Sequence, residues 1–271
     1  MASASQTAIA EICKHALFAK HAKQILAQVR PMIRFAPRKG KAADGKLGAS
    51  RLGGDPDLPE GTAWPRGPGF DGDDVPMDFI AQVNLDAIAD RDVDELLPKT
   101  GVLAFFLAQN YEGCAVIHGE HDDLVTTPPP GRKKSAKPPK HGGFDVFAEM
   151  ALPPPWSAFV SNTKRSATAW NSRTGKRGKG DTLVELPPAA HDAYTQIYQN
   201  TLEHEQHGMF GYERPMEGVQ RPGEVVLLRL DQDRHIPYDF VEVVSIYWFI
   251  TEKALAKRSF DEVEVFCGST I

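Results

Sequence analysis

The sequence predicts an α/β fold of the α+β type: a single compact domain with a mixed, largely antiparallel sheet, an N-terminal amphipathic helix and two long basic loops. Three observations support this prediction. Short segments rich in Val, Ile and Phe recur along the 271 residues, as strands do. Few segments have the length and period of helices. The composition, 41% hydrophobic and 25% charged, is that of a globular chain able to bury a sizeable core.

Residues 1–30 are expected to form an amphipathic helix that packs on the body of the fold. Apolar residues recur at steps of three and four from Ile9 to Val29, and Pro31 ends the pattern. Glu11 and several lysines interrupt the apolar residues, which argues against a secretion signal. The lysines and histidines leave open the alternative of a helix that binds a membrane surface or a partner.

The cysteines and the hydropathy pattern favour a cytoplasmic protein. Cys13, Cys114 and Cys267 are an odd number at wide spacing. They match neither a disulfide framework nor a CxxC metal site, so we expect reduced thiols. No apolar stretch approaches the ~20 residues that cross a bilayer, and we expect no membrane partner.

Residues 31–271 are expected to form the main body of the domain. A packed, rigid loop is predicted for Ser50–Arg66, because Gly53–Gly54 and three prolines exclude a helix while Leu52 and Trp64 are too apolar for a free linker. Strands are expected at Met32–Ala36, Phe79–Leu85, Gly101–Leu107, Cys114–His118, Asp145–Leu152, Val225–Asp231, Val241–Ile250 and Val263–Cys267. Helices are expected at Asp94–Leu97, Pro188–His204 and Thr251–Arg258, the last with Thr251 as its N-cap.

Two basic segments are expected to be loops inserted between elements, at 126–143 and 161–180. They are rich in Pro, Gly, Ser, Lys and Arg and poor in apolar residues. Residues 126–180 carry a net charge of +9, which leaves −14 on the rest of the chain. Such a bipolar charge distribution can steer the association of charged partners. Trp170 is the single aromatic residue in these loops that could stack on a base, which disfavours nucleic acid as the partner.

No residue pattern carries a catalytic or metal-binding signature. His204, Glu205 and His207 lie close together, but their spacing differs from HExxH and no third ligand is marked, so a polar cluster at a helix end is favoured over a metal site. Asp231 and Asp233 follow an apolar strand, where an acidic pair either holds a cation or caps the strand. GxSxG, GxGxxG and Walker motifs are absent from the sequence. We therefore expect no enzyme activity, no metal and no cofactor.

Five segments, taken in order, resemble the YwqG-like family of bacterial proteins. They are SRLGGDPDLPEGTAWPR at 50–66, FIAQVNL at 79–85, LPKTGVLAFF at 97–106, HGMFGYERPMEGVQ at 207–220 and VVLLRLDQD at 225–233. The first is the most specific, because it combines a Gly-Gly pair with Leu-Pro and Trp-Pro. The resemblance leaves the N-terminal helix and residues 110–200 outside it.

The resemblance implies one compact domain with antiparallel sheet, no established catalytic activity and, for some relatives, genes close to bacterial toxin systems. It marks as polar motif positions Arg51, Gln82, Asn84, His207, Gln220, Asp231 and Asp233. These side chains either satisfy backbone groups around the Gly-Gly loop or contact a ligand. Gln82 and Asn84 have the same parity on their strand and should share one face. The chain lacks the glycine that relatives show before their late strand, so a small ligand held there is not carried over.

These observations favour a non-enzymatic immunity protein that binds a cognate bacterial toxin and occludes its active site. A nuclease is the favoured toxin class, because nucleases carry basic clefts that an acidic surface complements. Candidate partner-binding residues are Asp71, Asp73, Asp74, Asp78, Asp92, Asp94 and Glu95. The alternative function is a small-molecule-binding protein or a hydrolase that uses the face of Gln82, Asn84 and Asp231.

Overall fold

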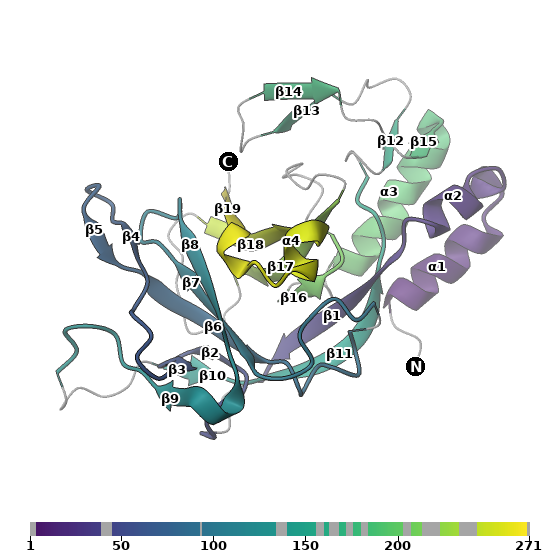
Figure 1. Ribbon diagram of the computed structural model, residues 1–271. Coiled ribbons are helices and arrows are strands. Elements are labelled where there is room, and N and C mark those ends of the chain that lie inside the picture. The colour runs from purple at the N-terminus through teal and green to yellow at the C-terminus, as the bar shows by residue number, and fades with distance from the viewer. Residues whose placement is uncertain are drawn as a thin grey trace. The chain divides into compact units, whose positions relative to one another are not determined.

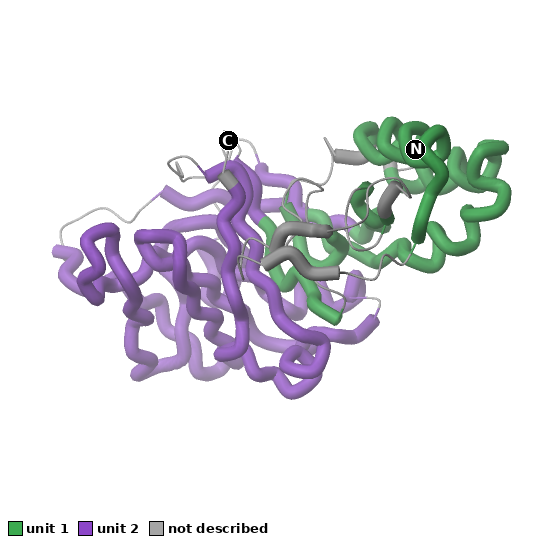
Figure 2. Tube along the Cα trace, turned by 90° about the horizontal axis from the view of Figure 1, so that it is seen from above, with its two compact units in different colours: residues 1–34, 148–229 green, residues 35–147, 230–271 purple. Residues whose placement is uncertain are grey.

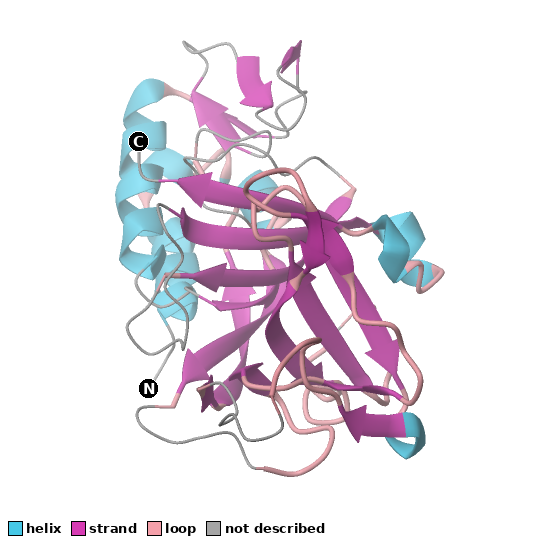
Figure 3. Ribbon diagram, turned by 90° about the vertical axis from the view of Figure 1, so that its left-hand side faces the viewer, coloured by secondary structure: helices cyan, strands magenta, loops and turns pink. Residues whose placement is uncertain are grey.

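The protein is an α+β structure in which most sheet pairings are antiparallel (Figure 1, Figure 3). The computed structural model describes residues 4–38, 45–92, 94–133, 140–155, 160–162, 168–171, 176–179, 184–202, 207–212, 223–232 and 243–269. The predicted fold class, the largely antiparallel sheet and the helical N-terminus are confirmed.

The chain divides into two compact units, each built from two separate stretches (Figure 2). Unit 1 comprises residues 1–34 and 148–229, and unit 2 comprises residues 35–147 and 230–271. Because neither unit is one continuous segment, no linker in the sequence marks the division.

Unit 1 contains the helices α1 (Ala4–Lys14), α2 (Ala22–Leu26) and α3 (Pro188–Leu202). The strands with residues in this unit are β1 (Arg30–Pro37), β11 (Phe144–Ala151), β12 (Val160–Asn162), β13 (Thr168–Asn171), β14 (Lys176–Lys179), β15 (Val184–Leu186), β16 (His207–Phe210) and β17 (Glu224–Asp231). The strands β1, β11 and β17 also contribute residues to unit 2.

The N-terminal helices pack on α3 through a shared apolar core. Ile12, Phe18 and Ile25 are completely buried there. Phe18 meets Tyr194 of α3 edge to face, with ring centroids 6.3 Å apart. The Tyr194 hydroxyl donates to the carbonyl oxygen of Pro153 at 2.5 Å, so this buried aromatic residue keeps a polar partner.

The single helix predicted for residues 1–30 is wrong, because the chain breaks at His15. The His15 backbone is extended, and its Nδ1 accepts from the N–H of Leu17 at 3.3 Å. This contact caps a short 3-10 turn, Ala16–Phe18, between α1 and α2. Phe18, after the break, is completely buried, whereas Cys13, in the last turn of α1, is exposed.

Unit 2 is organised around a five-stranded antiparallel sheet in the order β10-β2-β6-β7-β8. These strands are β2 (Arg51–Gly53), β6 (Asp78–Asn84), β7 (Val102–Leu107), β8 (Cys114–Gly119) and β10 (His141–Gly142). Smaller pairs join β3 (Asp57–Pro59) to β9 (Leu124–Thr126) and β4 (Arg66–Pro68) to β5 (Asp74–Pro76). The C-terminal part pairs β18 (Val243–Thr251) with β19 (Glu264–Ser269), with α4 (Glu252–Ala256) between them.

The central strand β7 is covered on both faces, as its continuous apolar sequence predicts. All six of its residues are buried. Phe105 meets Trp248 of β18 edge to face at 5.6 Å, and the next residue, Phe106, meets Trp64 in the same way at 5.3 Å. Successive side chains of a strand point to opposite faces, so β7 joins two layers of core.

The helix predicted at Asp94–Leu97 is wrong. The Asp92 carboxylate accepts from the backbone N–H of Leu96 at 3.1 Å and of Leu97 at 2.7 Å, which closes a turn instead. Glu95 has φ +52°, in the left-handed region, which an α-helix does not admit. An acidic side chain that competes for backbone N–H groups explains why local composition misled the prediction.

The described part of the predicted loop 161–180 contains strands. The strands β13 and β14 pair antiparallel from Thr168↔Lys179 to Asn171↔Lys176. Backbone bonds between neighbouring segments form this pair, so it needs no apolar composition. In the other predicted loop, 126–143, residues 134–139 lie outside the described residues.

Candidate functional site

The Gly-Gly loop predicted as a signature is built around one completely buried carboxylate, that of Asp57. Gly53 has φ +67° and Gly54 has φ +79°, so both adopt the left-handed conformation that glycine tolerates. Their turn takes the chain from β2 into β3, where Asp57 is the first residue. A Cβ on Gly54 would lie 3.0 Å from the side chain of His141, which closes the space beside the turn.

Protein groups occupy both oxygens of the Asp57 carboxylate. Oδ2 forms an ion pair with Arg51 and accepts from the Gly48 N–H at 2.7 Å and from Gln82 Nε2 at 3.1 Å. Oδ1 accepts from the Thr126 hydroxyl at 2.7 Å. The backbone N–H of Asp57 donates to Gln82 Oε1 at 2.7 Å. A buried charge with a cation and several donors around it is stable, and this one holds the loop together.

The motif residues Arg51, Gln82 and Asn84 fix the chain on both sides of β2. Arg51 donates to the carbonyl oxygen of Asp55 at 2.9 Å. Gln82 Nε2 donates to the carbonyl oxygen of Ala49 at 3.0 Å, and Asn84 Nδ2 donates to that of Gly48 at 2.8 Å. The two β6 side chains therefore share one face, as their parity predicts, and all three satisfy backbone groups as the structural interpretation requires.

Asp55 connects the loop to the basic segment 126–143. Its carboxylate, only 9% exposed, forms a two-pronged ion pair with Arg132, in which Nη2 lies 2.6 Å from Oδ2. The hydrogen bond with Asp55 raises the pKa of Arg132. Neither Asp55 nor Asp57 was predicted as a site residue, although the two acids flank Pro56 directly after the Gly-Gly pair of the signature segment.

The remaining polar motif positions, His207, Gln220, Asp231 and Asp233, are described only in part. His207 and Asp231 are buried, 1% and 2% exposed. Gln220, Asp233 and the metal-site candidates 204–205 lie outside the described residues. Within the described ranges, no group of three or more His, Cys, Asp or Glu side chains could hold a metal ion.

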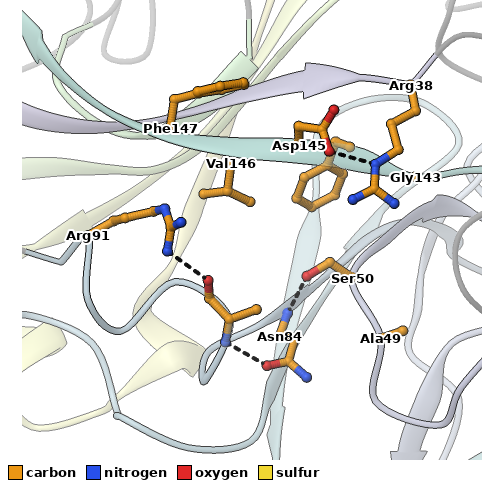
Figure 4. Close-up of a pocket in the computed structure, with 11 residues that line it drawn as sticks. Arg38, Ala49, Ser50, Asn84, Arg91, Gly143, Asp145, Val146 and Phe147 are labelled. Atoms are coloured by element: carbon orange, nitrogen blue, oxygen red, sulfur yellow. Dashed lines mark hydrogen bonds and ion pairs between the residues drawn. The ribbon is translucent and has the colours of Figure 1, made fainter.

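A pocket opens beside Asn84 in unit 2 (Figure 4). Its volume is about 580 Å³. Residues 143–147 form one wall, and the rest of its lining comprises Arg38, Ala49, Ser50, Asn84, Ala87 and Arg91. Of the residues proposed for the alternative small-molecule function, Asn84 lines this pocket, whereas Gln82 is completely buried in the loop network.

The predicted partner-binding acids separate into exposed and buried groups. The exposed ones are Asp71, Asp73, Asp74, Asp78, Asp94 and Glu95. Asp74 pairs with Arg66 at 2.7 Å, and Glu95 pairs with Lys99 at 3.0 Å. Asp92 is 8% exposed, and its carboxylate closes the turn before Leu97, so its role is structural.

A family model for a domain of unknown function, DUF1963, matches residues 50–267. The chain belongs to the DUF1963 family. The match begins at Ser50, the residue that precedes β2 and lines the pocket, and ends in β19. It also spans residues 110–200, which the sequence resemblance left outside. No curated protein matches the chain.

The DUF1963 match begins after α1, α2 and β1, so the N-terminal helices precede the family domain. The loop network of Asp57 and the pocket beside Asn84 lie almost entirely within the matched residues. Among the described helices, none is long and apolar enough to cross a membrane.

Proposed function

We propose that this protein is a cytoplasmic, non-enzymatic immunity protein of the YwqG-like type. It binds a cognate bacterial toxin, of which a basic nuclease is the favoured class, and occludes the active site of that toxin. The observation that carries the proposal is the β4–β5 hairpin, which presents an exposed aromatic ring among exposed carboxylates. Family membership alone assigns no activity, so the support comes from this surface.

The hairpin has a defined conformation. The pairs Arg66↔Pro76 and Pro68↔Asp74 align its strands. The Gly69 N–H donates to the carbonyl oxygen of Asp73 at 2.7 Å, which closes the tip. A tip that is ordered before binding loses less conformational entropy when a partner docks.

Phe70, at the tip, provides an anchor of the kind found at protein interfaces. It is 72% exposed and is the most exposed large apolar residue of the described chain. Its ring meets Tyr111 edge to face at 6.0 Å, so the ring is supported without being covered. Aromatic side chains with a polar surround contribute much of the binding energy of many interfaces.

The carboxylates around Phe70 supply charge complementarity. Asp71 and Asp73 follow Phe70 in the turn between β4 and β5, and their side chains have no ion-pair partner among the residues that the structure describes. Asp74 is partly neutralised by Arg66. A nuclease cleft that grips phosphates is basic, and paired carboxylates on a rigid tip are suited to occupy it.

A small-molecule-binding protein is the second candidate, and the pocket beside Asn84 favours it. The alternative predicted from the sequence places Gln82 in contact with the ligand. Its amide is instead engaged by Asp57 and Ala49. A hydrolase is the weaker part of the alternative, since no nucleophile and base pair lies in the pocket lining.

Co-expression with the products of the flanking genes tests the proposal. A toxin among them should arrest growth alone, should be neutralised by this protein, and should co-purify with it as a 1:1 complex. The double variant D71N/D73N should restore growth arrest. The matched control D122N/D123N, which removes the same charge from another exposed site, should still neutralise the toxin.

The proposal fails if no flanking product is toxic and bound, or if D71N/D73N protects as well as the unchanged protein does. Thermal stabilisation by a metabolite in the absence of any protein partner would support the second candidate.

A further inference from the structure

The pocket beside Asn84 has the size and the fixed walls of a ligand site. Its volume of about 580 Å³ lies within the roughly 300–1,000 Å³ typical of small-molecule sites. The Ser50 Oγ accepts from the Asn84 N–H at 2.8 Å, and Asn84 Oδ1 accepts from the Ala87 N–H at 2.9 Å. On the opposite wall, the Arg38 N–H donates to the carbonyl oxygen of Gly143 at 2.8 Å. These contacts order the walls before any ligand enters.

The polar groups that remain in the pocket are mainly donors. Arg38 uses Nε to bind Asp145 at 2.7 Å, and its two terminal nitrogens have no partner among the described residues. Arg91 uses Nη1 for Asp90 and for the Ala87 carbonyl oxygen, which leaves its Nε and Nη2 (Figure 4). The Ser50 hydroxyl hydrogen also lacks an acceptor in the described part of the chain. Arg91 and Arg38 lie on opposite sides of the pocket (Figure 4), and a guanidinium group with unused N–H donors can recognise an anion.

The charge of the lining favours a single negative charge on the ligand. Arg38 pairs with Asp145, and Arg91 pairs with Asp90, which lies outside the lining, so these four charges cancel. A carboxylate adds one negative charge and matches the planar fork of an arginine. A phosphate monoester, close to a dianion at neutral pH, adds about twice that charge.

The β11 wall supplies an apolar surface next to these donors. Val146 points from β11 into the pocket (Figure 4). Phe144 stacks on Phe35 with ring centroids 4.4 Å apart, so its ring is held in place. Phe147, the next residue of β11, points to the opposite face of the strand from Val146 (Figure 4). An apolar body on the ligand would cover this surface and exclude water from it.

We propose that the pocket binds an organic monoanion, in which a carboxylate meets Arg91 while an apolar body lies against Val146 and Phe144. This site is separate from the β4–β5 hairpin and does not depend on the toxin-binding proposal.

Titration of the ¹⁵N-labelled protein with 3-phenylpropionate, followed by NMR, tests the proposal. A ligand of this size in a matching site should bind with a Kd of roughly 4 mM, from the binding energy per atom of ordinary ligands. Shifts should appear at the amides of Ser50, Asn84 and Val146. The uncharged 3-phenylpropionamide has almost the same shape and should bind at least about tenfold more weakly.

Variants of the arginines distinguish binding in the pocket from a general effect of the protein's charge. R91Q should weaken 3-phenylpropionate about fivefold, and R91K, which keeps the charge but loses the fork, should lie between R91Q and the unchanged protein. R66Q is the matched control, because Arg66 also forms an exposed Arg–Asp pair but lies outside the pocket. It should bind as the unchanged protein does.

Four results would overturn the proposal: no saturable shift at these amides, equal binding of the amide and the acid, equal weakening by R66Q and R91Q, or tighter binding of phenyl phosphate than of the carboxylate. The last result would retain an anion site but reject the monoanion.

Discussion

Replacing Asp57 with asparagine should destabilise unit 2 by about 3 kcal/mol. Removal of one partner from a buried ion pair typically costs about 3–5 kcal/mol. The Arg51 side chain is 12% exposed and keeps some contact with water, which favours the lower end of that range. The asparagine amide would also present N–H groups where the Asp57 carboxylate now accepts from Gly48, Gln82 and Thr126. At least one donor would therefore lose its acceptor.

Urea unfolding followed by tryptophan fluorescence measures this effect, because Trp64 and Trp248 pack against β7 in unit 2. With an m-value of about 3 kcal/mol per molar urea, the midpoint should fall by about 1 M. E95Q is the matched control: it removes a carboxylate from an exposed pair with Lys99 and should cost below about 0.5 kcal/mol. A D57N midpoint equal to that of E95Q would refute the structural role assigned to Asp57.

Three further predictions concern a cap, a thiol and a carboxyl group. T251A should cost about 1 kcal/mol in thermal or urea unfolding, because the Thr251 hydroxyl accepts from a backbone N–H in the first turn of α4 at 3.1 Å; an unchanged stability would remove that role. Burial raises the pKa of Cys114 to about 12, so iodoacetamide at pH 8 should modify the exposed Cys13 first, as read by mass spectrometry, and equal rates would contradict this. Burial raises the pKa of Asp86, but the hydrogen bonds from His121 and from the Gly101 N–H and the electrostatic interaction with His121 together lower it by more, so the pKa lies below its ordinary value. Its stabilising contribution is present above the unfolded-state pKa of about 4 and is lost as the pH falls through the lower folded-state pKa, so D86N should slightly flatten the acid limb of the stability curve, and an acid limb as steep as that of the unchanged protein would contradict this.

The strands could be predicted because burial leaves a local imprint on the sequence. The continuous apolar run of β7 corresponds to its burial on both faces, whereas β6, whose sequence alternates, is also buried on both faces from Phe79 to Val83. The helix boundaries were harder to predict from the sequence, because single side chains determine them. His15 ends one helix by capping the next turn, and Asp92 replaces another by binding the backbone N–H of Leu97.

The candidate site could be predicted only in part, because its contacts join distant residues. The resemblance marked Arg51, Gln82 and Asn84, which surround the loop. It did not mark Asp57, whose partners Gln82 and Thr126 lie 25 and 69 residues away along the chain. The pocket is formed by residues that range from 38 to 147, and no spacing in the sequence indicates that they meet.

The charges and the aromatic ring of the β4–β5 hairpin should affect different rate constants of toxin binding. Charges that steer association act mainly on the association rate, whereas a buried anchor acts mainly on dissociation. F70A should therefore speed dissociation of the toxin complex with little change in the association rate. An unchanged dissociation rate would remove Phe70 from the interface.

The association rate of the toxin, measured against ionic strength, is the most direct test of the proposed function. At low salt, D71N/D73N should associate several-fold more slowly than the unchanged protein, with a flatter dependence on salt. The control D122N/D123N should keep a rate and a salt dependence close to those of the unchanged protein. Equal rates and equal salt dependence for the two double variants would contradict the assignment of toxin binding to the β4–β5 hairpin.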